Sequence, residues 1–314
     1  MEDTILSIGF VAGILMMMFR VLPIILMGAT GEMISEMAGM TNIGLEGIMS
    51  VGSIIGFLTS CYTKNPYFGM LAGILAGLVT NYIYAYLTIH LNADQIIVGN
   101  TINILGLAVA SLLYTTATKQ HSGMLTSVTA GPLKIPLLGD IPIIGNVFFN
   151  NSIVVDISLI LVVVAWFYLY KTKTGLALRA VGEYPRAAET LGIRIIRKKY
   201  FACSVCGMLC GFAGAYLTTV YISSYVSGVV SGRGYVALAA VIFGKWKPKG
   251  VLAACLFFSI IDALQLRLQI IDKAIPYQLL QMMPYLCTLI ALAFFMKPGC
   301  EPKANGKPYI REAR

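Results

Sequence analysis

The chain has 314 residues, of which 58% are hydrophobic and 12% charged, with a formal net charge of +9 and a mean hydropathy of +0.80. Soluble domains carry about 25% charged residues, so this deficit excludes an ordinary soluble protein. Several apolar runs of about 20 residues match the thickness of a bilayer's hydrocarbon core, which predicts an all-α, polytopic membrane protein. We attribute the positive charge to cytoplasmic loops rather than to a nucleic-acid surface, because Lys and Arg accumulate on that side of a membrane.

Nine apolar segments are expected, within a bundle of about 8–10 membrane helices. They span residues 5–31, 43–61, 67–90, 95–115, 152–170, 200–222, 233–244, 250–268 and 279–296. The segment 233–244 is too short for a full crossing, so it either begins earlier, near Val226, or is a half-helix. The count is least defined between residues 20 and 60, where the apolar run is interrupted by Arg20, Pro23, Glu32, Glu36 and Glu46.

The basic segments predict the orientation. A loop of about 171–199 is expected in the cytoplasm because it holds eight cations against Glu183 and Glu189. Counting crossings from it places a loop of about 116–151 and the N-terminus outside, and a tail of 299–314 inside, after a membrane domain of 1–298. The opening "MEDT" lacks a basic n-region, so no cleaved signal peptide is expected. The cations of the cytoplasmic loop are Lys171, Lys173, Arg179, Arg186, Arg194, Arg197, Lys198 and Lys199.

A short helix is expected inside this cytoplasmic loop. Pro185 suits its first turn and Gly192 its C-terminal end, and the intervening "RAAETL" favours a helix. Ala187 and Ala188 would leave one surface flat, which suits insertion into a groove on a partner protein. The alternative is a surface helix that only covers the end of the bundle.

Polar side chains at membrane depth are the candidates for a solute pathway. Glu46 lies between Gly44 and Gly47, shortly after Asn42. A charge there costs about 2.5–3.5 kcal/mol unless the carboxyl group faces a cavity, meets a cation or is protonated. It could equally stabilise the N-terminus of a helix. Asn100 and Asn103 share a helix face three residues apart, where they could bind a polar solute or only bond neighbouring helices.

Four stretches carry a family resemblance: "NIGLEGIM", "DQIIVGNTIN", "GLALRAVGEYPRAAETLGI" and "GRGYVALAAVIFGKWKPKG". Together they resemble the permease subunits of ABC importers, in the branch of bacterial nucleoside and simple-sugar permeases related to ribose and branched-chain amino acid permeases. The resemblance runs from about residue 20 to 298, and "NIGLEG" favours the nucleoside branch. It implies a type II-like importer permease fold in the plasma membrane.

The resemblance also implies partners. These are a second permease subunit, identical or paralogous, cytoplasmic ATPase subunits that use ATP and Mg, and an external substrate-binding lipoprotein. The helix 185–191 would be the coupling helix, although its "AAETLG" places Glu after the alanines, unlike the Glu-Ala-Ala order of other importers. The chain lacks a G-x-x-x-x-G-K-[ST] phosphate loop, so it is expected to be non-catalytic and without a cofactor of its own. The ATPase-coupling candidates are Arg179, Glu183, Pro185, Arg186, Ala187, Ala188, Glu189 and Gly192.

Other functions stay open from the sequence. A self-sufficient secondary transporter would use Glu46 as a proton or cation site. A membrane enzyme or scaffold is a weaker alternative, because no catalytic set of residues stands out. For the importer, nucleosides are the leading substrate, followed by simple sugars and by other small polar solutes such as riboflavin.

Overall fold

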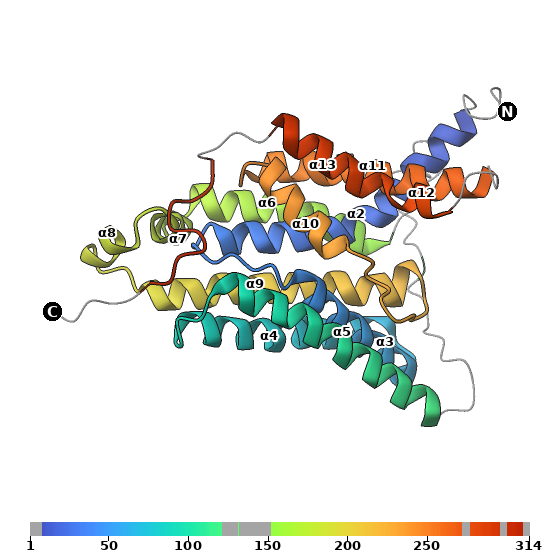
Figure 1. Ribbon diagram of the computed structural model, residues 1–314, viewed down its shortest axis with the longest axis horizontal. Helices are drawn as coiled ribbons and strands as arrows, with labels where there is room; N and C mark the ends of the chain where they lie inside the picture. Colours follow the sequence, from blue (N-terminus) through green and yellow to red (C-terminus); the bar gives the residue numbers. More distant parts are fainter. Residues whose placement is uncertain (1–7, 121–130, 132–151, 272–276, 296–299, 310–314) are drawn as a thin grey trace.

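The computed structural model describes residues 8–120, 131, 152–271, 277–295 and 300–309, and every regular element in them is helical (Figure 1). The long helices account for most of the bundle, and the shorter helices lie between them or after the last of them in the chain. In chain order they are α2 (Ile8–Glu36), α3 (Leu45–Thr63), α4 (Pro66–Ile89), α5 (Gln95–Gln120), α6 (Ile153–Lys171), α7 (Lys173–Glu183), α8 (Pro185–Thr190), α9 (Ile195–Tyr216), the π-helix η2 (Leu217–Tyr221), α10 (Arg233–Phe243), α11 (Pro248–Ile271), α12 (Tyr277–Gln281) and α13 (Met283–Phe295).

The expected membrane segments all correspond to helices. Seven helices of the described residues are long and apolar enough to cross a membrane, and the other two segments form the shorter helices α10 and α13. The all-α membrane bundle is therefore confirmed, and so is the half-helix alternative for residues 233–244. The predicted external loop of about 116–151 lies outside the described residues, apart from the end of α5 and residue 131.

The first helix is longer than expected. Residues 5–31 were the predicted segment, but α2 continues through Glu32 to Glu36. Both carboxyl groups are buried and have partners outside α2: Glu32 accepts from the Asn42 backbone N–H at 2.7 Å on the connection that follows, and Glu36 accepts from the distant Trp246 indole N–H. Burial of a carboxyl group is tolerated where hydrogen bonds replace water, so the acidic residues do not end the helix.

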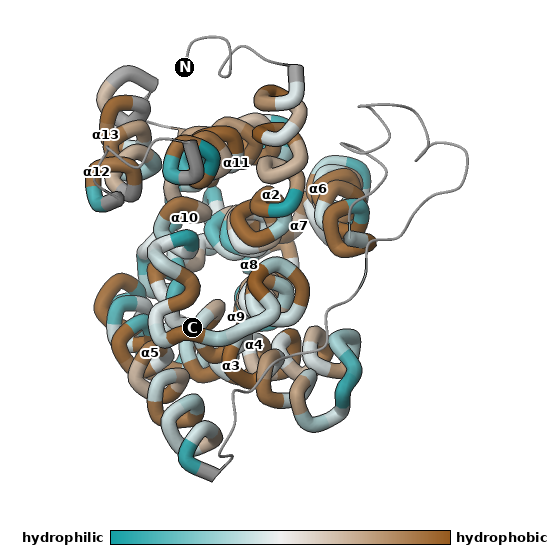
Figure 2. The backbone as a smooth tube through the Cα atoms, turned by 90° about the vertical axis from the view of Figure 1, so that its right-hand side faces the viewer, coloured by the Kyte–Doolittle hydropathy of each residue, from teal (hydrophilic) through white to brown (hydrophobic). Residues whose placement is uncertain are grey.

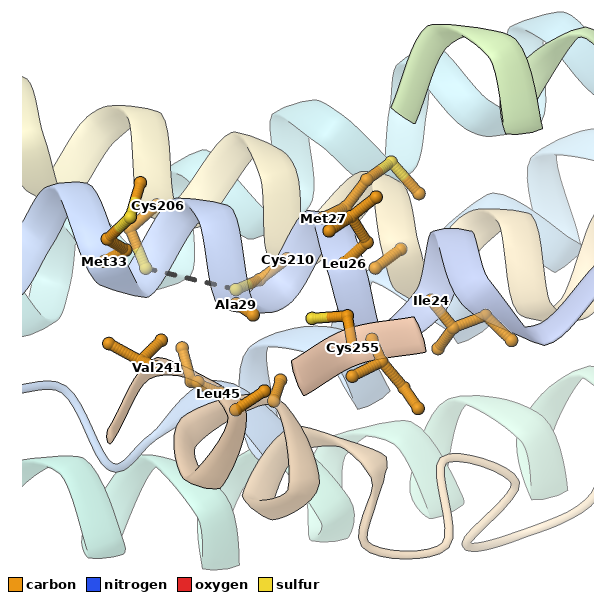
Figure 3. Close-up of a cluster of buried hydrophobic side chains, with 14 of the residues drawn as sticks. Ile24, Leu26, Met27, Ala29, Met33, Leu45, Cys206, Cys210, Val241 and Cys255 are labelled. Carbon is orange, nitrogen blue, oxygen red and sulfur yellow. Dashed lines mark hydrogen bonds between the residues drawn. The ribbon is translucent and has the colours of Figure 1, made fainter. Parts of the chain in front are cut away.

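The helices are arranged around α2. In the view along the bundle, α2 lies between α6, α10, α11 and α9, and α3, α4 and α5 form the layer beyond α9 (Figure 2). Cysteines contribute to this interior as small apolar side chains: Cys206 and Cys210 on α9 and Cys255 on α11 are fully buried beside apolar residues of α2 (Figure 3). The largest apolar cluster of the core thus extends along α2, and smaller clusters lie between α3 and α5 and at the base of α8.

Small residues allow α3, α4 and α9 to pack with their backbones in contact. A Cβ at Gly77 would collide with the backbone of Gly207 and Gly211, and a Cβ at Gly52 would collide with Gly211. Close approach of this kind is the usual source of helix association in lipid, where the hydrophobic effect between helices is absent. The glycines four residues apart in the sequence therefore form a packing seam.

The two ends of the bundle differ. The start of α2 lies at one end, whereas α7, α8 and the segment 300–309 lie at the other (Figure 1). At that second end the segment 300–309 contacts the loop of α7 and α8, and the Ala304 N–H donates to the Gly182 carbonyl at 2.9 Å. The polar composition of the tail is typical of a loose segment, but residues 300–309 are docked against the bundle.

Candidate functional site

The connection between α2 and α3, residues 37–44, is buried although it is not helical. Asn42 holds its centre: its side-chain amide nitrogen donates to Asn81 Oδ1 at 2.7 Å, its side-chain Oδ1 accepts from the Gly44 N–H at 2.8 Å, and its backbone N–H donates to Glu32. Asn81 in turn donates to the Cys203 carbonyl at 2.5 Å. Non-helical backbone at membrane depth must be satisfied by protein or water, and here the protein side chains do so.

Glu46 lies in the first turn of α3 and reaches across to the start of α10. Its Oε1 accepts from the Gly232 N–H and its Oε2 from the Gly234 N–H, both at 2.8 Å. The first N–H groups of a helix have no partner within the helix, so a carboxyl group from another helix satisfies two of them. The cap has no room for a side chain at Gly234, where a Cβ would meet Glu46.

Asn103 and Asn100 have opposite environments, although both lie on α5. Asn103 is 2% exposed, accepts from the Gly47 N–H at 2.8 Å, and donates to the Ile43 carbonyl and the Tyr235 hydroxyl at 2.9 and 3.0 Å. Asn100 is exposed on the outer face of the helix. The expected amide pair on one face is therefore not formed, because only Asn103 turns toward α3.

Of the four predicted pathway residues, the structure brings three into one polar region. Asn42, Glu46 and Asn103 each have hydrogen-bond partners within the protein: Asn42 and Asn103 fix the segment between α2 and α3, and Glu46 joins α3 to the start of α10. Asn100 lies apart from them on the open side of α5. A solute contact at any of these residues stays a prediction.

A polar cavity of about 120 Å³ lies beside the capped start of α10, and the sequence reasoning did not find it. Arg233 and Asp262 form an ion pair in its wall, with Nη2 and Oδ2 3.2 Å apart. Gln265 and Gln269 also line the cavity, and Arg233 Nε and Gln269 Nε2 have no hydrogen-bond partner among the described residues. Such unpartnered groups beside open space can bind a small polar ligand. The sequence signal that could have indicated this cavity is the polar series Asp262, Gln265 and Gln269 in the otherwise apolar α11.

The loop that carries α8 is held firmly at its base. Ala188 is 2% exposed and packs with Val181 and Ile195, whereas Ala187 is exposed. The expected flat surface of two alanines is thus wrong: one alanine anchors the helix and the other faces outward. Gly192 ends the segment with a φ of +77°, a conformation that favours glycine.

The remaining coupling candidates surround this exposed face. Pro185 occupies the first turn of α8, Arg186 and Glu183 are exposed, and Glu189 accepts from the hydroxyl of Tyr309. Arg179 lies further back, on α7, with its guanidinium 4.7 Å from the ring centroid of Tyr170.

The C-terminal segment completes the same surface. Lys303 donates to the Tyr184 hydroxyl, which raises the pKa of the Lys303 ammonium group, and its Nζ lies 4.7 Å from the centroid of that ring. Asn305 accepts from the Thr41 hydroxyl at 2.8 Å. The segment therefore connects the α8 loop directly to the buried connection between α2 and α3. No feature of the tail's polar sequence indicated this docking.

Comparison with known proteins now identifies the family. Residues 14–292 match the model of the family described as "Branched-chain amino acid transport system / permease component". The chain belongs to this family. It is a multi-pass membrane permease component of the ABC type.

Two similar curated proteins are named for nucleosides. The guanosine ABC transporter permease protein NupQ of Bacillus subtilis is 36% identical, over 92% of this chain and 94% of its own length. The nucleoside ABC transporter permease protein NupC of Lactococcus lactis subsp. cremoris is 35% identical, over 90% and 91%. A third, the putative glucose ABC transporter permease protein TsgC13 of Haloferax volcanii, is 34% identical, over 85% and 81%.

The fold has a counterpart among solved structures. A structure described as "An inward-facing conformation of a putative metal-chelate type ABC transporter" matches with a TM-score of 0.50, covering 93% of this chain and 88% of that one. The sequence identity is 15%, so this likeness shows the fold alone. It confirms the ABC permease architecture expected from the sequence.

Proposed function

We propose that this chain is a transmembrane subunit of an ATP-driven importer that carries nucleosides inward across the plasma membrane. The observation that carries the proposal is similarity over nine tenths of the chain to two permeases named for guanosine and nucleosides. A simple sugar is the second candidate, favoured by the similar protein named for glucose. The N-terminus would lie outside and the loop with α8 in the cytoplasm, as the basic residues predict.

The partner ATPase would bind at the exposed face of α8. Arg186 and Ala187 face outward there, beside Lys303 and Lys307 of the docked tail, so a complementary groove could receive this surface. The ATPase would use ATP and Mg and transmit its movement through α8. A second permease subunit and an external binding lipoprotein complete the proposed assembly.

The polar cavity beside α10 is our candidate for contact with the solute. Its ion pair and amides offer donors and acceptors to the hydroxyl groups of a ribose or another sugar, whereas Asn42 and Asn103 are already engaged. This assignment explains why polar groups without partners lie in an otherwise apolar bundle.

Uptake by reconstituted vesicles tests the function. Vesicles with this chain, its ATPase, a second permease and the binding protein should accumulate labelled guanosine when ATP is supplied, and vesicles with this chain alone should not. Accumulation of glucose in place of guanosine would favour the sugar alternative. Uptake by the chain alone, without ATP, would overturn the importer and support a secondary transporter.

A substitution on α8 tests the docking surface. Ala187→Glu should abolish co-purification of the ATPase and uptake while leaving the thermal unfolding of the chain unchanged, because Ala187 is exposed. Ala188→Glu is a poor probe, since it would place a charge in the packed base of the loop. Retained co-purification with Ala187→Glu would place the ATPase elsewhere.

A further inference from the structure

An apolar groove of about 450 Å³ runs between α6 and α9, with α2 as its floor. Its lining residues are almost all aliphatic or aromatic and include Ile157, Val164, Leu209 and Phe212. Both walls belong to membrane-spanning helices, and α6 and α9 each pack against α2. The groove is therefore a lipid-accessible trough rather than part of the polar region described above.

The groove continues into a basic cavity at the end of the bundle that carries α7 and α8. This second cavity, of about 640 Å³, is lined by Arg194, Arg197 and Lys198, and it shares Tyr168 and Phe201 with the apolar groove. The Lys198 ammonium group donates to the Thr174 carbonyl at 3.3 Å. Neither arginine forms an ion pair within the described part of the chain, and none of the residues that line the cavity is acidic.

The junction of the two cavities lies at the level of an aromatic belt. Trp166, Tyr168 and Tyr170 cluster in the last turns of α6, and Lys171 lies 5.8 Å from the centroid of the Trp166 ring. Aromatic residues with adjacent cations mark the headgroup level of a bilayer. The apolar groove is then at the depth of acyl chains, and the basic cavity is at the depth of phosphate groups.

The start of α9 adds to the positive potential of the basic cavity. Arg194 is the N-cap of this 22-residue helix, and its side chain forms no hydrogen bond with the N–H groups of the first turn. The unpaired N–H groups of a helix start attract anions. Two guanidinium groups, one ammonium group and a helix start thus converge where an apolar trough ends.

We infer that this composite groove binds one anionic phospholipid, with an acyl chain between α6 and α9 and its phosphate at Arg194 and Arg197. A single lipid satisfies both halves at once: its chain fills apolar space, and its headgroup accepts hydrogen bonds from the guanidinium groups. A helix of another subunit would fill the apolar half but would leave the basic half without a counter-charge.

Native mass spectrometry of the assembled transporter tests this inference. The complex in mixed micelles is offered dioleoyl phosphatidylglycerol or dioleoyl phosphatidylcholine, and the tightly bound lipids are counted. Arg194→Gln with Arg197→Gln should weaken retention of phosphatidylglycerol by about 30-fold, since each cation contributes about fivefold toward an anionic headgroup. Lys247→Gln with Lys249→Gln removes two exposed cations from another basic segment and should change nothing.

A matched pair of variants tests the apolar half of the groove. Val164→Trp adds bulk to a side chain that lines the groove and is 54% exposed, whereas Val163→Trp adds the same bulk to a neighbour that is 63% exposed and does not line it. Only Val164→Trp should displace the lipid. Because both positions are exposed, each variant should fold.

Four results would overturn the inference. Equal retention of phosphatidylglycerol by the Gln pair and the wild type would exclude a headgroup at the arginines. Equal retention by Val164→Trp would exclude a chain in the groove. Displacement of the bound lipid by inorganic phosphate, or cross-linking of Val164→Cys to another subunit, would identify a soluble anion or a protein helix as the occupant. Arg194→Lys with Arg197→Lys should keep the lipid and exclude misfolding as the cause of a loss.

Discussion

Two polar regions lie side by side around the start of α10, and they differ in how completely their groups are bonded. On the α3 side, Glu46 and Asn103 are buried and engaged with backbone and side-chain partners. On the α11 side, Arg233 and Asp262 form an ion pair next to a cavity in which the Gln269 Nε2 has no hydrogen-bond partner among the described residues. Buried groups that are fully bonded stabilise a structure, whereas unpartnered groups beside space are available to a ligand.

Glu46→Ala gives the largest expected effect, because it removes the acceptor of two buried N–H groups at the start of α10. Each unsatisfied group costs about 1–3 kcal/mol, so the loss of about 2–6 kcal/mol should prevent isolation of a folded protein. Glu46→Gln keeps one oxygen acceptor and should lower the thermal unfolding midpoint less. Size-exclusion profiles and unfolding midpoints measure both. A fully stable Glu46→Ala protein that lacks uptake would instead assign Glu46 to the pathway.

Asn103→Leu should destabilise the protein by about 1–3 kcal/mol, since the buried Gly47 N–H would lose its acceptor inside the bundle. The matched control is Asn100→Leu, three residues earlier on the same helix but exposed, which should leave the unfolding midpoint unchanged. Equal midpoints for the two variants would mean that the network around Asn103 does not hold the α2–α3 connection.

Asp262→Asn should affect transport more than stability. It removes the negative charge beside Arg233 but preserves an acceptor oxygen, and we expect a stability loss of about 1–2 kcal/mol. Uptake of nucleoside by the complete assembly should fall about tenfold or more, equivalent to about 1.4 kcal/mol or more. Unchanged uptake would show that the cavity is not part of the solute pathway. The two polar regions would then differ in bonding but not in function.

Gln269→Leu has the smallest expected effect on stability. The Gln269 Nε2 has no partner among the described residues, so replacing the amide with an apolar side chain should change the free energy of unfolding by about 0–1 kcal/mol, with the variant as stable as the wild type or more so. Uptake should nevertheless decrease. A clear fall in the unfolding midpoint would show that the amide already contributes to the fold.

The sequence predicted the helices better than the connections between them. Apolar runs are local, so they located the membrane helices and the short α10, although α2 extends five residues beyond its predicted end and α7 was not predicted; Pro185 and Gly192 located α8. The polar contacts are not local: Glu46 caps Gly232 from 186 positions away, and Glu36 bonds Trp246. Without knowing these partners, the sequence could not tell a satisfied carboxyl group from one that faces a pathway.

The sequence was equally unable to predict which side chains are exposed at a surface or a cavity. The burial of Ala188 beside Ala187 depends on Ile195 and Val181, and the cavity at Asp262 depends on the helix that Arg233 begins. The cluster of Lys and Arg residues located the loop that carries α8, because such a cluster between two apolar segments can be recognised from neighbouring residues alone. Which side of the loop is exposed depends on packing, which only the folded chain shows.

The docked segment 300–309 has a consequence for biogenesis. It follows every membrane helix in the chain, so the ribosome delivers it after α13 has been synthesised, and its contacts with Thr41 and Gly182 form only when both of those distant parts are in place. The contacts of this segment therefore join the first connection of the bundle, the end of α7 and the C-terminal part of the described chain, so they can be completed only after the preceding helices have been synthesised.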